Sequence, residues 1–245
     1  MIRSIMIVLF LTLFFLAGIL IWAAAWIIGR FDPYKRDLLC LRSVQAAFKI
    51  ILFISGVKVD VYGEEHVPKD QAVLYIGNHR SYFDIVITYA RCPRLTGYVA
   101  KDSMLKIPFL RTWMKMLHCL FLNRTDIKEG LKMVLTGIDK IKNGISMCIF
   151  PEGTRVRTET EMDMLPFKEG SLKMAEKTGC PIIPMALVHT AEIFEKHVPF
   201  VRKTRAVLMY GEPIYVKELD KDQRRHLGAY TQDVIKGMIE EAMTL

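Results

Sequence analysis

Apolar residues follow two different patterns along this chain, and the first marks a membrane segment. Residues 4–29 contain no charged side chain and consist mostly of Leu, Ile, Phe, Ala and Trp. A helix of about 20 such residues is long enough to cross the hydrocarbon core of a bilayer. Residues 38–56 are again mostly apolar but include Arg42 and Lys49, which predicts a second helix lying in the membrane interface with its cations directed toward the headgroups. Residues 1–56 are therefore the predicted anchor.

The anchor has more than one interpretation. Arg3 and the alanines at 23–25 resemble parts of a secretory signal peptide, but the apolar run is longer than a usual signal core and continues past the alanines. We therefore expect an uncleaved anchor. Lys and Arg are more frequent after the first run than before it, and the positive-inside rule then places the rest of the protein in the cytoplasm. A spanning hairpin and one that dips into a single leaflet both fit this pattern.

Beyond residue 56, short β-branched runs alternate with longer helical ones. The pattern predicts strands at 57–61, 72–76, 97–100, 119–122, 145–150 and 182–188, with one or two more within 205–216. It predicts helices near 82–91, 103–117, 127–141, 171–178 and 227–239, the second kinked or restarted at Pro108. This alternation predicts one α/β domain over residues 57–245, with a mostly parallel central sheet flanked by helices. Functional sites in such sheets gather at the carboxyl ends of strands.

The net charge indicates which partners suit the chain, and the cysteine content indicates its redox compartment. The 245 residues carry a formal net charge of +8, and the anchor and the remainder each hold about half of it. A basic surface beside an apolar anchor suits anionic lipid. Nucleic acid, the other usual partner of a basic chain, is disfavoured because no aromatic–basic motif accompanies the charge. The five cysteines are dispersed without a CxxC pair, which favours a reducing compartment over a disulfide framework or a zinc site.

The string NHRSYFD at residues 78–84 follows a predicted strand and places His79 five residues before Asp84. Across a turn into a helix, a carboxylate can accept the proton of one imidazole nitrogen and leave the other nitrogen free as a base. No nearby Ser or Cys is clearly arranged as a nucleophile, so the base would deprotonate a hydroxyl of the substrate. The competing interpretation is a helix capped by Asn78 or Ser81 with a satisfied histidine. A metal site is not expected, because the string offers too few ligands.

The string FPEGTR at residues 150–155 ends another predicted strand. Pro151 removes a ladder donor and Gly153 permits left-handed backbone, so the strand should end in a sharp turn. Arg155 then offers a planar fork for phosphate. Glu152 could hold an acceptor hydroxyl, or it could neutralise a neighbouring cation and fix the loop. A turn held by its own ion pair is the structural alternative.

Together, these two strings resemble the first and third motifs of the glycerophospholipid acyltransferases, and most closely those of the 1-acylglycerol-3-phosphate (lysophosphatidic acid) acyltransferases. Residues 120–124, LFLNR, resemble the intervening motif, and residues 181–186, PIIPMA, resemble the fourth. Asn123 stands where many members of that family have an acidic residue, which leaves the contribution of this motif to acceptor choice open. Four motifs in the family's order make a chance match a poor explanation.

The resemblance implies an enzyme that moves a fatty acyl group from acyl-CoA or acyl carrier protein to the sn-2 hydroxyl of lysophosphatidic acid, giving phosphatidic acid at the cytoplasmic face of a membrane. It implies that His79 is the general base and that Asp84 orients it. No cofactor is implied besides the acyl donor, which is a co-substrate. The residues that the resemblance implies for substrate binding are Lys101, Arg124, Glu152, Gly153, Thr154 and Arg155.

Other functions stay open on the sequence alone. The acceptor could be glycerol-3-phosphate or another lysolipid, because the strings define the reaction better than its acceptor. A non-catalytic, membrane-anchored lipid-binding protein would need the anion clamp but not the His–Asp pair. A hydrolase would use water in place of the acceptor hydroxyl, and the absence of a G-x-S-x-G nucleophile elbow argues against it.

Overall fold

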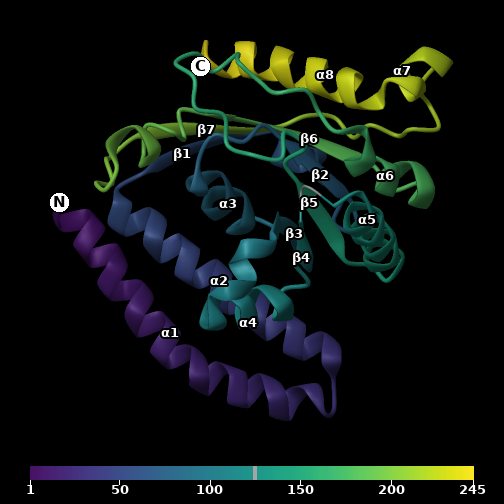
Figure 1. The fold of residues 1–245 in the computed structure, drawn as a ribbon. Helices are drawn as coiled ribbons and strands as arrows, with labels where there is room; N and C mark the ends of the chain where they lie inside the picture. Colours follow the sequence, from purple (N-terminus) through teal and green to yellow (C-terminus); the bar gives the residue numbers. More distant parts are fainter. Residues whose placement is uncertain (124–125) are drawn as a thin grey trace.

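A computed structural model describes residues 1–123 and 126–245, in which a helical hairpin precedes a layered α/β domain (Figure 1). The hairpin consists of α1 (Ile2–Gly29) and α2 (Pro33–Ser55). Asp32 begins α2 by accepting the backbone N–H of Lys35 at 3.0 Å, and Pro33 suits the first helical position. Gly56 ends the helix with a φ of +69°, a left-handed conformation that glycine adopts without a steric penalty.

α1 is apolar and largely unburied. Only 6% of its apolar stretch is buried, against 39% of the corresponding stretch of α2. Both helices are long and apolar enough to cross a membrane, by length and composition alone. Large apolar side chains point outward along most of α1, among them Leu9, Leu13, Leu16 and Leu20. A contiguous apolar surface of this kind is typical of a contact with lipid or with another protein.

The α/β domain is built on a seven-stranded sheet with the order β1-β7-β6-β2-β5-β3-β4. From β6 through β2, β5 and β3 to β4, neighbouring strands run parallel, whereas β7 is antiparallel to β6 and parallel to β1. The predicted mostly parallel sheet is therefore confirmed, and its reversed edge consists of β7 and β1. The strands are β1 (Lys58–Tyr62), β2 (Leu74–Gly77), β3 (Thr96–Lys101), β4 (Leu120–Leu122), β5 (Ser146–Ile149), β6 (Ile182–Val188) and β7 (Arg205–Tyr210).

Helices cover both faces of this sheet (Figure 1). The hairpin, α3 (Tyr82–Tyr89) and α4 (Pro108–Met116) pack on one face, and α5 (Ile127–Lys142), α6 (Lys173–Thr178) and α8 (Leu227–Ala242) pack on the other. Successive strand side chains enter opposite cores, so the central strands are continuous apolar runs in the sequence. The remaining helical segments are α7 (Lys221–Arg225) and the 3-10 helices η1 (Glu64–His66), η2 (Asp102–Lys106), η3 (Glu169–Ser171) and η4 (Glu195–His197).

Three predicted elements differ from the structure in detail. The second apolar helix, predicted over residues 38–56, begins already at Pro33. The helix predicted over residues 171–178 begins only at Lys173, after η3. The strand pattern within residues 205–216 corresponds to one strand, β7, and an isolated bridge between Ile182 and Ile214. Proline lacks the N–H that a continuing ladder needs, and Pro213 lies between β7 and that bridge. Pro108 restarts a helix, as predicted, because α4 begins there after η2.

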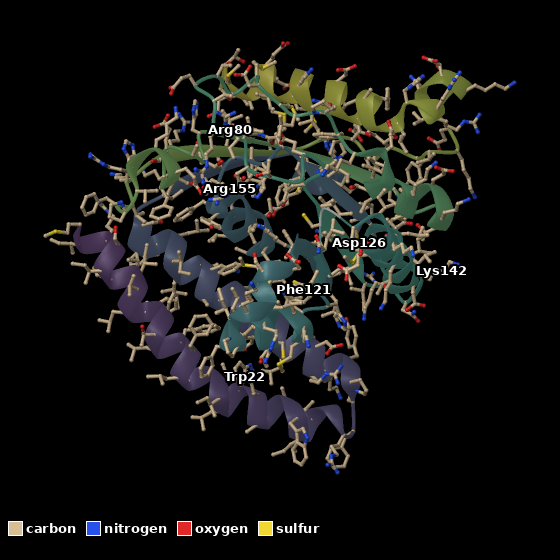
Figure 2. The ribbon with its side chains drawn as sticks, in the orientation of Figure 1. Trp22, Arg80, Phe121, Asp126, Lys142 and Arg155 are labelled. Atoms are coloured by element: carbon tan, nitrogen blue, oxygen red, sulfur yellow. The ribbon has the colours of Figure 1, made fainter. Side chains whose placement is uncertain are left out.

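Aromatic side chains join the hairpin to the α/β domain. Trp113 of α4 is buried, and its ring centroid lies 5.1 Å from that of Phe14 and 5.8 Å from that of Trp22, both in α1. Gly18 allows this approach, since a β-carbon there would lie 3.1 Å from Trp113 Nε1. Figure 2 shows Trp22 between α1 and α4. The hairpin is thus packed against the domain by specific contacts.

Candidate active site at the carboxyl ends of β2 and β5

The two strings leave the sheet at the same edge, because β2 and β5 are parallel neighbours in register. Asn78 anchors the first string to β6: its side-chain amide donates to the carbonyl of Leu187 and accepts from the N–H of Leu187, both at 2.8 Å. The second string is tied to the first by the N–H of Val156, which donates to the carbonyl of His79 at 2.8 Å. Strand order therefore brings together two strings that are about 70 residues apart in the chain.

His79 and Asp84 form a hydrogen-bonded pair. Nδ1 of His79 lies 2.8 Å from Oδ2 of Asp84, which is fully buried. An ionised carboxylate only accepts hydrogen bonds, so Nδ1 carries the proton and a neutral imidazole presents its lone pair at Nε2. Among the residues that the structure describes, none forms a hydrogen bond with Nε2. The geometry is that of an oriented base.

The same aspartate also caps a helix. Ser81 is the N-cap of α3 and accepts the N–H of Phe83 at 2.9 Å, while Oδ2 of Asp84 accepts the N–H groups of Ser81 at 2.7 Å and Arg80 at 2.8 Å. The capped helix and the His–Asp pair were alternatives in the sequence, and the structure contains both. Since backbone donors hold Asp84 in place, the carboxylate is positioned independently of the imidazole.

Glu152 supports His79 through the backbone. It is 4% exposed, and its two oxygens accept the N–H of His79 at 2.8 Å and the N–H of Leu165 at 2.9 Å. Burial raises the pKa of the Glu152 carboxyl above its ordinary value, although these two N–H groups oppose the shift. The expected sharp turn is present, with Gly153 at a φ of +74° and its N–H bonded to the carbonyl of Phe150. Phe150 also stacks on the His79 ring, with centroids 4.3 Å apart.

Arg155 is held against the start of α3. Its Nη1 donates to Oε1 of Glu195 at 2.8 Å, and its guanidinium carbon lies 3.7 Å from the centroid of the Tyr82 ring. In the structural alternative, an ion pair within the second string held the turn, but Arg155 pairs with Glu195 of another segment, η4, and the two oxygens of Glu152 accept backbone N–H groups. Arg155 lies next to the residues that begin the helix carrying Asp84.

The other predicted substrate-binding residues are less closely connected to the base. Lys101 is exposed at the end of β3, which is parallel to β5, so its backbone lies at the same edge of the sheet. Thr154 is exposed in the turn between Gly153 and Arg155. The structure shows no contact of Lys101 or Thr154 with His79 within the described ranges. Arg124 lies outside the described residues.

Two residues of the site had no predicted role. Arg80 is 2% exposed, pairs with Glu161 at 3.2 Å and donates to the carbonyl of Thr158 at 2.5 Å, so it holds the loop that follows the second string. Figure 2 shows Arg80 and Arg155 on the same side of the molecule, far from Lys142 at the end of α5. Glu195 is the second residue of the site that had no predicted role. It follows the carboxyl end of β6, and the tendency of sites to gather at strand ends was the signal that could have identified it.

The described part of the chain does not support a reaction that uses a cysteine thiol or a bound metal ion. Burial raises the pKa of the Cys92 thiol to about 11 and that of Cys148, in β5, well above its ordinary value. Both are therefore protonated and unreactive at neutral pH. In residues 1–123 and 126–245, no group of three His, Cys, Asp or Glu side chains is arranged to hold a metal ion.

Comparison with known proteins shows the family of this chain. The family model described as "Acyltransferase" matches residues 58–188, more than half of the chain. A 1-acyl-sn-glycerol-3-phosphate acyltransferase from Borreliella burgdorferi is 34% identical over 80% of this chain and 78% of its own length. The enzyme of that name from Saccharomyces cerevisiae is 27% identical over 97% of this chain and 76% of its own length.

A solved structure extends the similarity to the helical hairpin. The 1-acyl-sn-glycerophosphate (LPA) acyltransferase PlsC from Thermotoga maritima superimposes with a TM-score of 0.74 at 26% sequence identity, covering 98% of both chains. The similarity therefore includes α1 and α2 as well as the α/β domain. The fold, the family model and the relatives lead to one conclusion: this chain is an enzyme of the Acyltransferase family and belongs with the 1-acyl-sn-glycerol-3-phosphate acyltransferases.

Proposed function

We propose that this enzyme transfers a fatty acyl group from acyl-CoA or acyl carrier protein to the sn-2 hydroxyl of lysophosphatidic acid, with His79 as the general base. The observation that supports it best is the 2.8 Å hydrogen bond from His79 Nδ1 to Asp84, which leaves Nε2 as the basic nitrogen. The acceptor is proposed from the names of the relatives, which act on 1-acyl-sn-glycerol-3-phosphate.

In the proposed reaction, Nε2 of His79 removes the proton of the acceptor hydroxyl as its oxygen attacks the thioester carbon of the donor. The C–O bond forms, the C–S bond breaks, and the imidazolium returns its proton to the leaving thiolate. Asp84 stabilises the imidazolium while it exists, because the carboxylate already accepts the Nδ1 proton. No covalent acyl-enzyme is needed, and both products leave with their protons balanced.

Arg155 and Lys101 bind the acceptor phosphate in this proposal, and residues 152–154 shape the acceptor site. Arg155 supports this role best, since a guanidinium presents several N–H donors in a plane that suits phosphate oxygens. The cations act by neutralising charge and orienting the hydroxyl toward His79, and they form no bonds with the reacting atoms. Glu152 contributes by holding the backbone of His79 at 2.8 Å.

Membrane attachment through the hairpin is part of the proposal. The outward side of α1 is apolar, and the N-terminal end of α1 lies beside the segment that joins β6 to β7 (Figure 1). There the N–H of Val201 donates to Oγ of Ser4 at 2.9 Å, six residues after Glu195 of the site. A lipid surface on α1 would thus lie near the site at which a lysolipid reacts. The excess of cations after α1 supports a cytoplasmic location of the domain.

Release of free thiol tests the proposed function. Protein purified in detergent is given oleoyl-CoA or an oleoylated carrier protein together with lysophosphatidic acid, glycerol-3-phosphate or another lysolipid. We expect release with lysophosphatidic acid and a fall of about 10²–10⁴-fold for His79→Ala. The matched control is His226→Ala, an exposed histidine whose side chain forms no cap for α8. No thiol release with any donor and acceptor would refute the enzyme, whereas release with another acceptor alone would correct the substrate.

A further inference from the structure

We propose that Glu195 is a positioning residue for acceptor binding: it fixes Arg155 beside the N-terminus of α3, so that the guanidinium is oriented before the acceptor phosphate arrives. This inference rests on the proposed function, in which Arg155 binds that phosphate. Glu195 lies in η4, outside both strings, and its side chain is 9% exposed. A buried carboxylate at this place requires compensating donors, and the structure supplies them from both strings.

Glu195 joins the two strings through three hydrogen bonds. Oε1 accepts Nη1 of Arg155 and the N–H of Tyr82, both at 2.8 Å. Oε2 accepts the hydroxyl of Ser81 at 2.5 Å. Two of these donors belong to the start of α3, which carries Asp84 in its first turn. One side chain therefore sets the position of the proposed phosphate-binding arginine relative to the helix that orients the base.

The contacts with Glu195 and Tyr82 hold the guanidinium of Arg155 in place but leave some of its N–H donors available to bind an anion. One nitrogen of Arg155 bonds to Glu195, and one face of the guanidinium stacks on the Tyr82 ring. Arginine has five N–H donors, so a fixed plane still offers donors to an anion on its other edge. Holding a flexible side chain in advance reduces the entropy lost on binding. Glu195 itself forms no contact with His79 among the described residues, so it is a positioning residue and not a catalytic one.

The test compares Glu195→Ala with Glu195→Gln in the thiol-release assay. Alanine removes every acceptor, and we expect the KM for lysophosphatidic acid to rise about tenfold while the KM for the acyl donor is unchanged. Glutamine keeps an oxygen at Oε1 for Arg155 and Tyr82, so it should rescue most of the acceptor affinity. Glu192→Ala is the matched control, because Glu192 lies in the same segment but pairs with Lys196 at 2.7 Å.

A double-mutant cycle distinguishes positioning from a general structural role. In an Arg155→Ala background, Glu195→Ala should raise the acceptor KM no further, since the residue that it positions is gone. An unchanged or lower acceptor KM in Glu195→Ala, or full additivity with Arg155→Ala, would overturn the inference. If the alanine variant does not fold, Glu195→Asp replaces it. Its shorter side chain cannot reach both partners, so its acceptor KM should also rise, and an unchanged value would overturn the inference equally.

Failure of this inference is distinguishable from failure of the proposed function. The proposed function is tested on the unmodified enzyme and on His79→Ala, through the presence of turnover. The role of Glu195 is tested on the ratio of acceptor KM values among variants of an active enzyme. An active enzyme with no response to Glu195→Ala would retain the proposed function and lose only the positioning role.

Discussion

Nε2 of His118 lies 2.8 Å from Oδ2 of Asp37, and this contact joins the helical hairpin to the α/β domain. Nζ of Lys140 lies 3.2 Å from Nδ1 of the same ring. Lysine has only donors, so Nδ1 accepts and the imidazole proton resides on Nε2, facing the carboxylate. Both side chains of the pair are mostly buried, and His118 adopts a φ of +59° between α4 and β4. The contact is therefore a specific, enclosed polar link between α2 and the domain.

Removal of this link should destabilise the protein. Asp37→Ala leaves the buried N–H of His118 without an acceptor and removes the partner of the partly exposed Arg36, which together should cost about 3 kcal/mol. We expect a fall of roughly 6–12 °C in the thermal unfolding midpoint in detergent. Asp70→Ala, at an exposed position before β2, is the control. Equal midpoints for both variants would show that the stability of the fold does not depend on this link.

Asp84→Asn should separate the two roles of this residue. The amide oxygen can still accept the N–H groups of Arg80 and Ser81, so the cap of α3 is largely kept. The amide NH₂ then occupies the position of Oδ1, a buried atom with no partner among the described residues, and the negative charge facing His79 is lost. We expect kcat to fall about 10²–10⁴-fold with little change in acceptor KM, because the imidazolium is no longer stabilised.

Asp84→Ala provides the comparison for that prediction. It removes the charge together with the part of the capping box that Asp84 supplies, while Ser81 still accepts the N–H of Phe83, so it should match the asparagine variant in kcat and also lose about 1 kcal/mol of stability, visible in thermal unfolding. An asparagine variant with normal kcat would mean that Asp84 only caps α3. Circular dichroism of both variants establishes that α3 and the rest of the fold are retained.

Glu152 should make the protein less stable as the pH rises. Its native pKa lies above the ordinary value of 4.5, because burial outweighs the N–H groups of His79 and Leu165. The native chain therefore binds this proton more tightly than the unfolded chain. The stability due to the proton is fully present below the unfolded-state pKa and is lost as the pH rises through the folded-state pKa.

Glu152→Gln removes this titration, and unfolding midpoints measured from about pH 4 to pH 7 test it. We expect the stability of the wild type to decline relative to that of the variant as the pH rises across this window. Glu159→Gln, in a fully exposed position of the following loop, should follow the wild-type curve. Parallel curves for the wild type and Glu152→Gln would contradict a carboxylate whose charge is penalised by burial.

The sheet could be predicted well from the sequence because its signals are local. The strand predicted over residues 182–188 matches β6 at both bounds, since a continuous apolar run between a glycine and polar residues is typical of a strand buried on both faces. The reversal of β7 and β1 could not be predicted. Strand direction there depends on how the irregular chain between β6 and β7 turns, including η4, and no periodic pattern describes such a segment.

In the site, too, a contact between residues close in the sequence could be predicted, whereas a contact between distant residues could not. His79 and Asp84 lie five residues apart in one string, so their contact is nearly local and their spacing was informative. Glu195 is 40 residues from Arg155, and the two meet because β6 lies beside β2 in the sheet, on the side opposite to β5. That neighbourhood follows from the strand order, which is a property of the whole fold. One of the two interpretations left open for Glu152, that it neutralises a neighbouring cation, is not found among the described residues, because the backbone N–H groups of His79 and Leu165 bond to its two oxygens.

Maleimide labelling should leave the native enzyme active. Cys92, Cys148 and Cys180 are buried, and burial raises the pKa of each thiol, to about 11 for Cys92. At pH 8, roughly a thousandth of a thiol with that pKa is ionised, and only the thiolate reacts. We expect slow labelling of these three cysteines in the native state and rapid labelling in denaturant, counted by mass spectrometry. Loss of thiol-release activity in proportion to labelling of one cysteine would contradict the prediction, because it would place a reactive thiol near His79 in a reaction that is proposed to need none.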